Sequence, residues 1–254
     1  MTNWIQAARL RTLPLSISGI IIGSFTARWR LLSEGNKWDW QIFALAMLVT
    51  ILYQILSNFA NDYGDGIKGT DRLRTENAEI RMVASGKISA QKMKSAIIIT
   101  AVLSLLATIT LLYKTFIPNY LPEFFIFLGL GVLCILAAIG YTVGKNSYGY
   151  MGLGDVMVFI FFGIISVGGS YFLFTKIWSW DILLPASAVG MLSTTVLNLN
   201  NMRDMESDRL SGKKTFALRI GFRNAMIYQI VLMQLPLIFI LIFLMMNNLH
   251  TKKG

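Results

Sequence analysis

The sequence predicts an all-α protein, a polytopic transmembrane helical bundle with about seven spans. The first observation behind this prediction is composition, because 55% of the 254 residues are hydrophobic and only 14% are charged, whereas soluble domains carry about 25% charged residues. The second is the length of the apolar runs, several of which reach the roughly 20 residues that an α-helix needs to cross a bilayer. We therefore expect residues 1–254 to form one transmembrane domain embedded in lipid.

Polar connections separate the apolar runs and give the order of the expected spans. The N-terminal segment lacks the small-residue cleavage site of a secretory signal, so the first span is expected to be retained. Gly163, Gly168 and Gly169 in the fifth span would let neighbouring helices approach closely. The predicted spans are 12–29, 40–60, 95–113, 123–141, 153–174, 182–200 and 225–247.

Positive charge is distributed unevenly over the connections. The side that holds the N-terminus and connections 61–94, 142–152 and 201–224 carries sixteen Lys and Arg residues, and the other side carries seven. By the positive-inside rule the first side faces the cytoplasm, which predicts a bacterial inner-membrane protein with a site that opens to the cytoplasm. The net charge of +10 then fits loops beside an anionic leaflet, and no nucleic-acid partner is expected.

A polar stretch at the end of the second span holds most of the chemical information. It contains Asn58, Asn61, Asp62, Asp65 and Asp71. On a helix, Asn58, Asp62 and Asp65 are spaced i, i+4 and i+7 and share one face. Carboxylates this close repel each other unless a cation lies between them. Hard oxygen ligands suit Mg²⁺, which takes one or two carboxylates and fills its other positions with water and substrate phosphate.

A second polar stretch follows the sixth span. Asn200, Asp204 and Asp208 are spaced i, i+4 and i+8, again on one helical face. One such cluster could be a solvated loop at the membrane surface, but two with matching Asn-x-x-x-Asp spacing on one side of the membrane indicate a shared metal site. The single cysteine, Cys134, and the single histidine, His250, leave carboxylates as the expected ligands.

Three further features are candidates for the same site. Arg81 could bind phosphate oxygens in a bidentate way, or could be an ordinary cytoplasmic arginine. Asp155 begins an apolar helix, where an acid is stabilised by the helix dipole, yet an ionisable group at membrane depth is a functional candidate by default. The tyrosine-rich turn at 141–150 could be an interfacial aromatic belt.

Carboxylates, a magnesium ion and nearby basic side chains together suit a diphosphate. In a membrane-embedded cavity the natural diphosphate ester is polyprenyl diphosphate, because its tail is apolar. The cations would stabilise the charge that develops on the leaving diphosphate. The allylic cation left behind needs a dry pocket, where an electron-rich aromatic ring would attack it.

The motifs Asn58-x-x-x-Asp62-x-x-Asp65 and Asp204-x-x-x-Asp208 resemble the two aspartate-rich motifs of the UbiA superfamily of intramembrane aromatic prenyltransferases. Longer motifs at 61–69, 141–155 and 200–215 are similar to those of the branch that acts on 1,4-dihydroxy-2-naphthoate in menaquinone synthesis. They read Asn-Asp-Tyr-Gly-Asp-Gly-x-Lys-Gly, Tyr-Thr-x-Gly-Lys-x-x-Tyr-Gly-Tyr-x-Gly-Leu-Gly-Asp and Asn-Asn-x-Arg-Asp-x-x-x-Asp-x-x-x-Gly-Lys-x-Thr. The resemblance runs from about Arg11 to Arg223.

This resemblance implies transfer of a long prenyl chain from polyprenyl diphosphate to 1,4-dihydroxy-2-naphthoate, with loss of the carboxyl group, to give demethylmenaquinone. It implies that five residues hold the Mg²⁺-diphosphate, and we expect the acids among them to be catalytic: Asn58, Asp62, Asp65, Asp204 and Asp208. It also implies substrate-binding or acid–base roles for Arg81, Arg203, Tyr141, Lys145 and Asp155.

Several alternatives stay open at this level. The family fold usually has eight or nine spans, so either the last one or two helices are missing from this chain or two adjacent spans have been counted as one. Another branch of the superfamily would use a 4-hydroxybenzoate or haem-type acceptor. A transporter would place its acids at mid-span, and a phospholipid head-group transferase would carry an Asp-Gly-x-x-Ala-Arg pattern that is absent here.

Overall fold

The computed structural model describes residues 2–69 and 81–251, and within these ranges the chain is helical with no strand. Asp71 and the side chain of His250, both considered above, lie outside the described residues. Seven helical segments of the described chain are long and apolar enough to cross a membrane, so the all-α, seven-span prediction is confirmed and no two spans had been merged.

Three of the seven segments consist of more than one helical element. The first and fifth are built from several, the sixth begins with a short 3₁₀ turn, and three short helices lie in the connections. In chain order the elements are α1 (Thr2–Ala8), η1 (Leu10–Thr12), α2 (Leu13–Ser33), α3 (Trp40–Lys68), α4 (Ala90–Phe116), α5 (Leu121–Gly140), η3 (Tyr148–Met151), α6 (Gly154–Val158), η4 (Phe159–Gly168), α7 (Gly169–Thr175), η5 (Trp180–Ile182), α8 (Leu183–Arg203), α9 (Met205–Leu210), α10 (Phe216–Ile220) and α11 (Phe222–Thr251).

Helix α3 continues to Lys68, beyond the predicted end of the span at residue 60. Its start is capped by the Asp39 side chain, which accepts a hydrogen bond from the Gln41 amide at 2.7 Å. Its end is set by Gly69, whose φ of 75° is the left-handed conformation that glycine adopts at a helix C-terminus. The polar residues of the first acidic motif therefore lie on the last turns of a helix and not in a loop.

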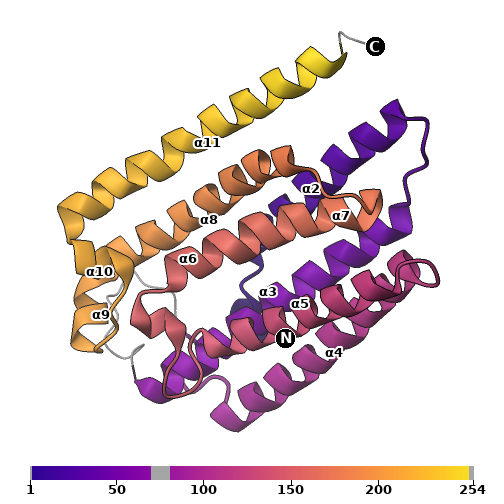
Figure 1. Ribbon diagram of the computed structural model, residues 1–254. Helices are drawn as coiled ribbons and strands as arrows, with labels where there is room; N and C mark the ends of the chain where they lie inside the picture. Colours follow the sequence, from indigo (N-terminus) through magenta and orange to yellow (C-terminus); the bar gives the residue numbers. More distant parts are fainter. Residues whose placement is uncertain (1, 70–80, 252–254) are drawn as a thin grey trace.

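The helices form one bundle in which α4 and α11 lie on opposite outer sides (Figure 1). Helix α3 packs against α4, α5 and α2, whereas α8 packs against α11 and η4. Helix α2 contacts both α3 and the η4–α7 segment, so it joins the two halves of the bundle. The C-terminal end of α3 lies at the same end of the bundle as α9 and α10 (Figure 1).

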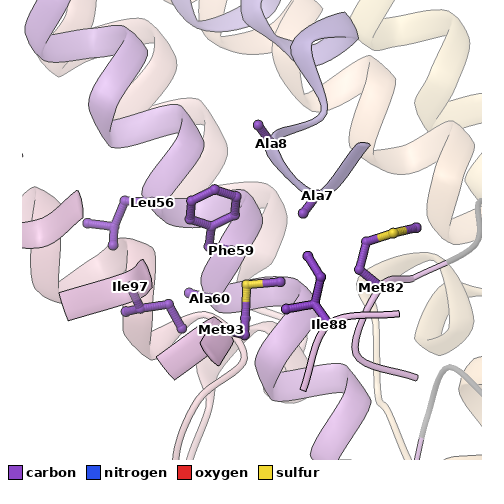
Figure 2. Close-up of a cluster of buried hydrophobic side chains, with 9 residues drawn as sticks. All are labelled: Ala7, Ala8, Leu56, Phe59, Ala60, Met82, Ile88, Met93 and Ile97. Atoms are coloured by element: carbon purple, nitrogen blue, oxygen red, sulfur yellow. The ribbon is translucent and has the colours of Figure 1, made fainter. Parts of the chain in front are cut away.

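A cluster of buried hydrophobic side chains supports the end of α3. Leu56, Phe59 and Ala60 of this helix pack against Met82 and other apolar residues, and Figure 2 shows all nine members converging from separate segments. The other six are Ala7, Ala8, Met82, Ile88, Met93 and Ile97. The cluster ties α1, the 82–88 connection and α4 to the helix that carries the first acidic motif.

The fifth span has an unusual interior. Its middle section, η4, is a π-helix of ten residues, a rare conformation that is frequent at functional sites. It crosses α8 at very short range, because a Cβ atom at Gly163 would lie 2.5 Å from the Ala186 carbonyl oxygen and 2.7 Å from the Gly190 Cα. Small residues at this crossing let the two backbones meet, as the sequence predicted for Gly163.

We expect Gly163→Ala to destabilise the protein because the new methyl group would meet backbone atoms that cannot rotate away. Overpacking of this kind costs about 1–3 kcal/mol. Gly129→Ala is the matched control, since nothing lies within 4 Å of a Cβ at that position of α5 and alanine has the higher helix propensity. Thermal unfolding in detergent should show a lower Tm for the first variant only. Equal Tm values would contradict the close η4–α8 crossing.

Candidate functional site

A cavity of about 720 Å³ lies inside the bundle, a size typical of ligand sites. Its walls come from α2, α3, α5, η4 and α8, and most of the lining side chains are apolar. At one end lie Phe127, Phe172 and Trp178, and the rings of the first two are stacked with centroids 5.4 Å apart. The opposite end reaches the turns of α3 and α8 that carry Asn61 and Asn200.

Asp62 directly follows the cavity-lining Asn61 on α3 and is 1% exposed. Its two carboxylate oxygens accept hydrogen bonds from the backbone amides of Met82 and Val83, at 3.0 and 2.8 Å. The carboxylate therefore satisfies two amides of the connection that leads to α4. Each carboxylate oxygen has a second lone pair, so these two bonds leave Asp62 able to accept further partners.

Asp65 lies one turn further along α3 and is 2% exposed, and its partners include a phenol and a guanidinium. The Tyr150 hydroxyl donates to its Oδ1 at 2.8 Å. The guanidinium of Arg81, which is 7% exposed, lies 3.4 Å from its Oδ2. Arg81 is thus buried beside the first acidic motif, whereas an arginine that only marks the cytoplasmic side would be exposed to solvent.

Asn58 lines the cavity on the α3 turn that precedes Asp62. Its side-chain amide donates to the Ala8 carbonyl at 2.8 Å and to the Thr12 hydroxyl at 3.0 Å. Asn58 therefore ties α3 to α1 and η1, at the start of the first span.

The second acidic motif is not one continuous helix. Helix α8 ends at Arg203 and α9 begins at Met205, with Asp204 at the junction. The Asp204 amide still donates to the Asn200 carbonyl at 3.0 Å and the Asp208 amide to the Asp204 carbonyl at 2.9 Å, so the predicted i, i+4, i+8 spacing is kept across the junction. Arg203 donates to both oxygens of Asp204, at 2.7 and 2.9 Å. Asp208 is 3% exposed, and its Oδ1 lies 3.7 Å from the Lys213 ammonium.

Tyr141 and Asp155 lie together beside these acids. A Cβ at Gly154 would be 3.2 Å from the Tyr141 hydroxyl, which places the start of α6 against this ring. Burial raises the pKa of the Tyr141 phenol, and the negative charges of Asp65, Asp155 and Asp208 raise it further. Its hydroxyl therefore stays protonated and can donate a hydrogen bond.

Asp155 is 5% exposed, and neither of its carboxylate oxygens has a hydrogen-bond partner among the residues that the structure describes. A buried carboxylate without partners is costly, so it indicates a group that meets a ligand. Its position in the first turn of α6 agrees with the sequence prediction.

Lys145 does not join the group. It lies in the turn between α5 and η3, is exposed and is not among the residues that line the cavity. Its anchoring role stays a prediction. Two other lysines, which the sequence did not single out, lie at the polar end instead: Lys68 donates to the Thr142 carbonyl at 2.8 Å, and Lys213 lies beside Asp208.

The donor set fits a hard divalent cation that is shared with a substrate. Within residues 2–69 and 81–251, no group of three or more His, Cys, Asp or Glu side chains is close enough to hold a metal ion alone. A magnesium ion needs only one or two carboxylates when phosphate and water supply its other oxygens. Asp65 and Asp208, both close enough to Tyr141 to affect its pKa, offer carboxylates from the two motifs.

Comparison with known proteins places the chain in a family. Residues 21–251 match the UbiA prenyltransferase family. The chain belongs to the UbiA prenyltransferase family. This result confirms the resemblance that the motifs indicated, and it sets aside the transporter and head-group transferase alternatives.

Relatives from several bacteria are similar along most of their length. The chain is 42% identical over 251 residues to an Escherichia coli protein, which covers 99% of this chain and 79% of the relative. It is 41% identical to a Haemophilus influenzae protein, over 94% of this chain and 76% of the relative. A Mycobacterium tuberculosis protein is 35% identical, over 89% and 73%. All three relatives are named 1,4-dihydroxy-2-naphthoate octaprenyltransferase.

Asp62→Ala should free the connection that this carboxylate holds. Loss of both hydrogen bonds leaves the Met82 and Val83 amides without their acceptor. Because hydrogen bonds to a charged acceptor are strong, the two amide hydrogens should exchange with solvent roughly tenfold faster. Hydrogen–deuterium exchange of the peptide that contains both amides measures this change. Asp204→Ala is the control, because Asp204 is bonded to Arg203, and it should change the same peptide by less than about twofold. Unchanged exchange in Asp62→Ala would contradict the anchoring role.

Proposed function

We propose that this chain transfers a polyprenyl group from polyprenyl diphosphate to 1,4-dihydroxy-2-naphthoate, with release of diphosphate and CO₂, to give demethylmenaquinol, the two-electron-reduced form of demethylmenaquinone. The observation that carries the proposal is a long apolar cavity whose polar end is lined by Asn58, Asn61 and Asn200, the asparagines beside the two acidic motifs, in a chain 41–42% identical to relatives named for this reaction. The acceptor distinguishes this proposal from the 4-hydroxybenzoate and haem-type branches.

The polar end would bind the diphosphate. Asp62, Asp65, Asp204 and Asp208, together with Asn58, would hold Mg²⁺, which supplies charge stabilisation for the departing diphosphate. Arg81 is buried, and its guanidinium lies 3.4 Å from the Asp65 carboxylate. A diphosphate bound beside this carboxylate would therefore lie within reach of the guanidinium, which can bind phosphate oxygens. Arg203, which is more exposed, would bind the outer phosphate oxygens.

The apolar part of the cavity would hold the prenyl tail. On α3 both Ala46 and Asn61 line the cavity, and fifteen residues of helix span about 22 Å. The cavity therefore follows much of the roughly 30 Å thickness of a bilayer core. A tail in this position keeps its first double bond next to the polar end and its remainder among apolar side chains.

The reacting carbons would meet near Tyr141. The bond between the prenyl C1 and the diphosphate oxygen breaks, and its electron pair leaves with the diphosphate. The allylic cation survives only where water is excluded, and Leu197, an apolar residue of the cavity wall, lies with Tyr141 beside Gly154. The naphthoate ring then supplies an electron pair to C1 and forms the new carbon–carbon bond.

The carbon that bears the carboxylate is the proposed nucleophile. The neighbouring hydroxyl group pushes electron density onto this carbon, and Asp155 could accept the hydroxyl proton as this occurs. The carbon–carboxylate bond then breaks, CO₂ leaves, and the electron pair returns to the ring and restores aromaticity. Tyr141 could donate a hydrogen bond to the acceptor, and Lys145 could hold the carboxylate if the turn that carries it moved inward.

We also propose that the site opens to the cytoplasmic side of the bacterial inner membrane. The sixteen-to-seven charge bias supports this orientation. Both acidic motifs lie at one end of the bundle (Figure 1), which is the arrangement that a shared opening requires. Prenyl diphosphates, magnesium and the naphthoate acceptor are all available on that side.

The proposed reaction can be tested with acceptor that carries ¹³C in its carboxyl group. Membranes that contain the protein, supplied with polyprenyl diphosphate and Mg²⁺, should release one labelled CO₂ for each prenylated naphthol formed. Mass spectrometry of the product and of the released gas measures both. A prenylated product that kept the label, or turnover with 4-hydroxybenzoate alone, would place the chain in another branch of the family.

Asp65→Ala and Asp208→Ala should each reduce turnover by at least about a hundredfold, because losing one preorganised electrostatic group typically costs 10²–10³ in rate. Glu34→Ala is the control, since Glu34 is exposed in the connection before α3. The initial rate of prenylated product at saturating substrates measures the effect. Near wild-type rates for either aspartate variant would show that its carboxylate is a surface group.

A further inference from the structure

The two helices that carry the acidic motifs do not pack extensively against each other. Among the described residues, α3 is covered chiefly by α1, α2, α4 and α5, and α8 by α6, η4, α10 and α11. If both motifs bind one metal–diphosphate, another part of the chain has to set the distance between them. The connection between α5 and α6 lies between the two motifs.

Tyr150, in the 3₁₀ helix η3 of this connection, contacts both sides. Its hydroxyl donates to Asp65 Oδ1 at 2.8 Å. Its own carbonyl oxygen accepts a hydrogen bond from the Lys214 amide at 3.1 Å, in the segment that follows α9. One residue thus bonds the first motif through its side chain and the second motif's loop through its backbone.

The ring of Tyr150 also lies between two ammonium groups. The Nζ of Lys68 is 4.0 Å from the ring centroid, and that of Lys213 is 5.6 Å away, both within the range of a cation–π interaction. Lys68 follows Asp65 on α3, and Lys213 lies 3.7 Å from Asp208. The ring therefore holds one cation from each motif beside the carboxylates.

We propose that Tyr150 is a positioning residue that holds the Asp65 carboxylate and the Lys68 and Lys213 ammonium groups in the arrangement that receives a metal-bound diphosphate. The proposal rests on the proposed function for the identity of the ligand. Tyr150 acts through Asp65. Its hydroxyl holds Oδ1 of the Asp65 carboxylate, and this fixes the direction in which Oδ2 faces Arg81 or a bound cation. It fixes the second motif through the Lys214 amide and the Lys213 ammonium.

A neighbouring tyrosine provides a matched control. Tyr148 belongs to the same short helix, but its hydroxyl donates to the Ala137 carbonyl at 2.8 Å, a backbone group outside both motifs. Removing either hydroxyl deletes one hydrogen bond of the same length. Only the Tyr150 hydroxyl has a carboxylate of the acidic motifs as its partner, so a difference between the two variants reports on positioning and not on a lost hydrogen bond in general.

The test uses the purified full-length protein in detergent with Mn²⁺ and inorganic diphosphate as the probe. Electron paramagnetic resonance measures bound Mn²⁺ as both are titrated. We expect Tyr150→Phe to weaken Mn²⁺ binding roughly tenfold, as loss of a hydrogen bond to a charged group implies, and Tyr148→Phe to change it by less than about twofold. In turnover assays, Tyr150→Phe should raise KM for polyprenyl diphosphate more than it lowers kcat.

A second measurement distinguishes weaker ligand binding from a general loss of stability in the variant protein. The rise in Tm on adding Mg²⁺ and diphosphate compares each variant with itself, and it should be smaller for Tyr150→Phe than for wild type and Tyr148→Phe. Equal Mn²⁺ affinity in all three proteins, or equal losses in both variants, would overturn the proposal. The wild-type product assay reads the proposed function separately, so a naphthoate prenyltransferase with an unaffected Tyr150→Phe variant would contradict this inference alone.

Discussion

Carboxylates buried at one end of an apolar bundle are the constraint on which the structure depends. Asp62, Asp65 and Asp208 are at most 3% exposed, and a buried charge is stable only when nearby groups compensate it. The compensating groups differ among the three carboxylates. Two backbone amides donate to Asp62, a guanidinium and a phenol lie against Asp65, and an ammonium lies beside Asp208. Those partners come from the connections between spans, so the need to compensate charge also folds the connections over the polar end of the cavity.

This arrangement divides the molecule into two chemical environments that meet at Tyr141. On one side is an apolar cavity between α2, α3, α5 and η4, lined at its far end by aromatic rings. On the other side is a set of charged groups that already neutralise one another. A diphosphate with its metal brings both signs of charge, so it can replace these internal partners without leaving an uncompensated ion. The uncompensated Asp155 carboxylate is the exception, and it lies where the aromatic acceptor would meet the ring of Tyr141.

The sequence predicted the number and order of the spans because a bilayer imposes a narrow range of length and polarity on each helix. It also predicted which residues gather at the polar end, since helical spacing places Asn58, Asp62 and Asp65 on one face. Spacing cannot show what that face meets, so the bonds from Asp62 to the 82–83 amides were not foreseen. The break at Asp204 and the exposure of Lys145 depend on tertiary packing as well. Tyr148 and Tyr150 look equivalent in the sequence, and only their partners, Ala137 and Asp65, distinguish them.

The central claim is that both acidic motifs bind one metal–diphosphate at the polar end of the cavity. An experimental structure of the protein with Mn²⁺ and a non-reactive prenyl thiolodiphosphate tests it most directly, because the anomalous signal of manganese locates the metal independently of the ligand. With a shared site, we expect a manganese peak bonded to carboxylates of both motifs, the diphosphate next to Arg81, and the prenyl tail along α3 towards Phe172. Manganese bound to one motif alone, or a tail that lies outside the cavity, would contradict it.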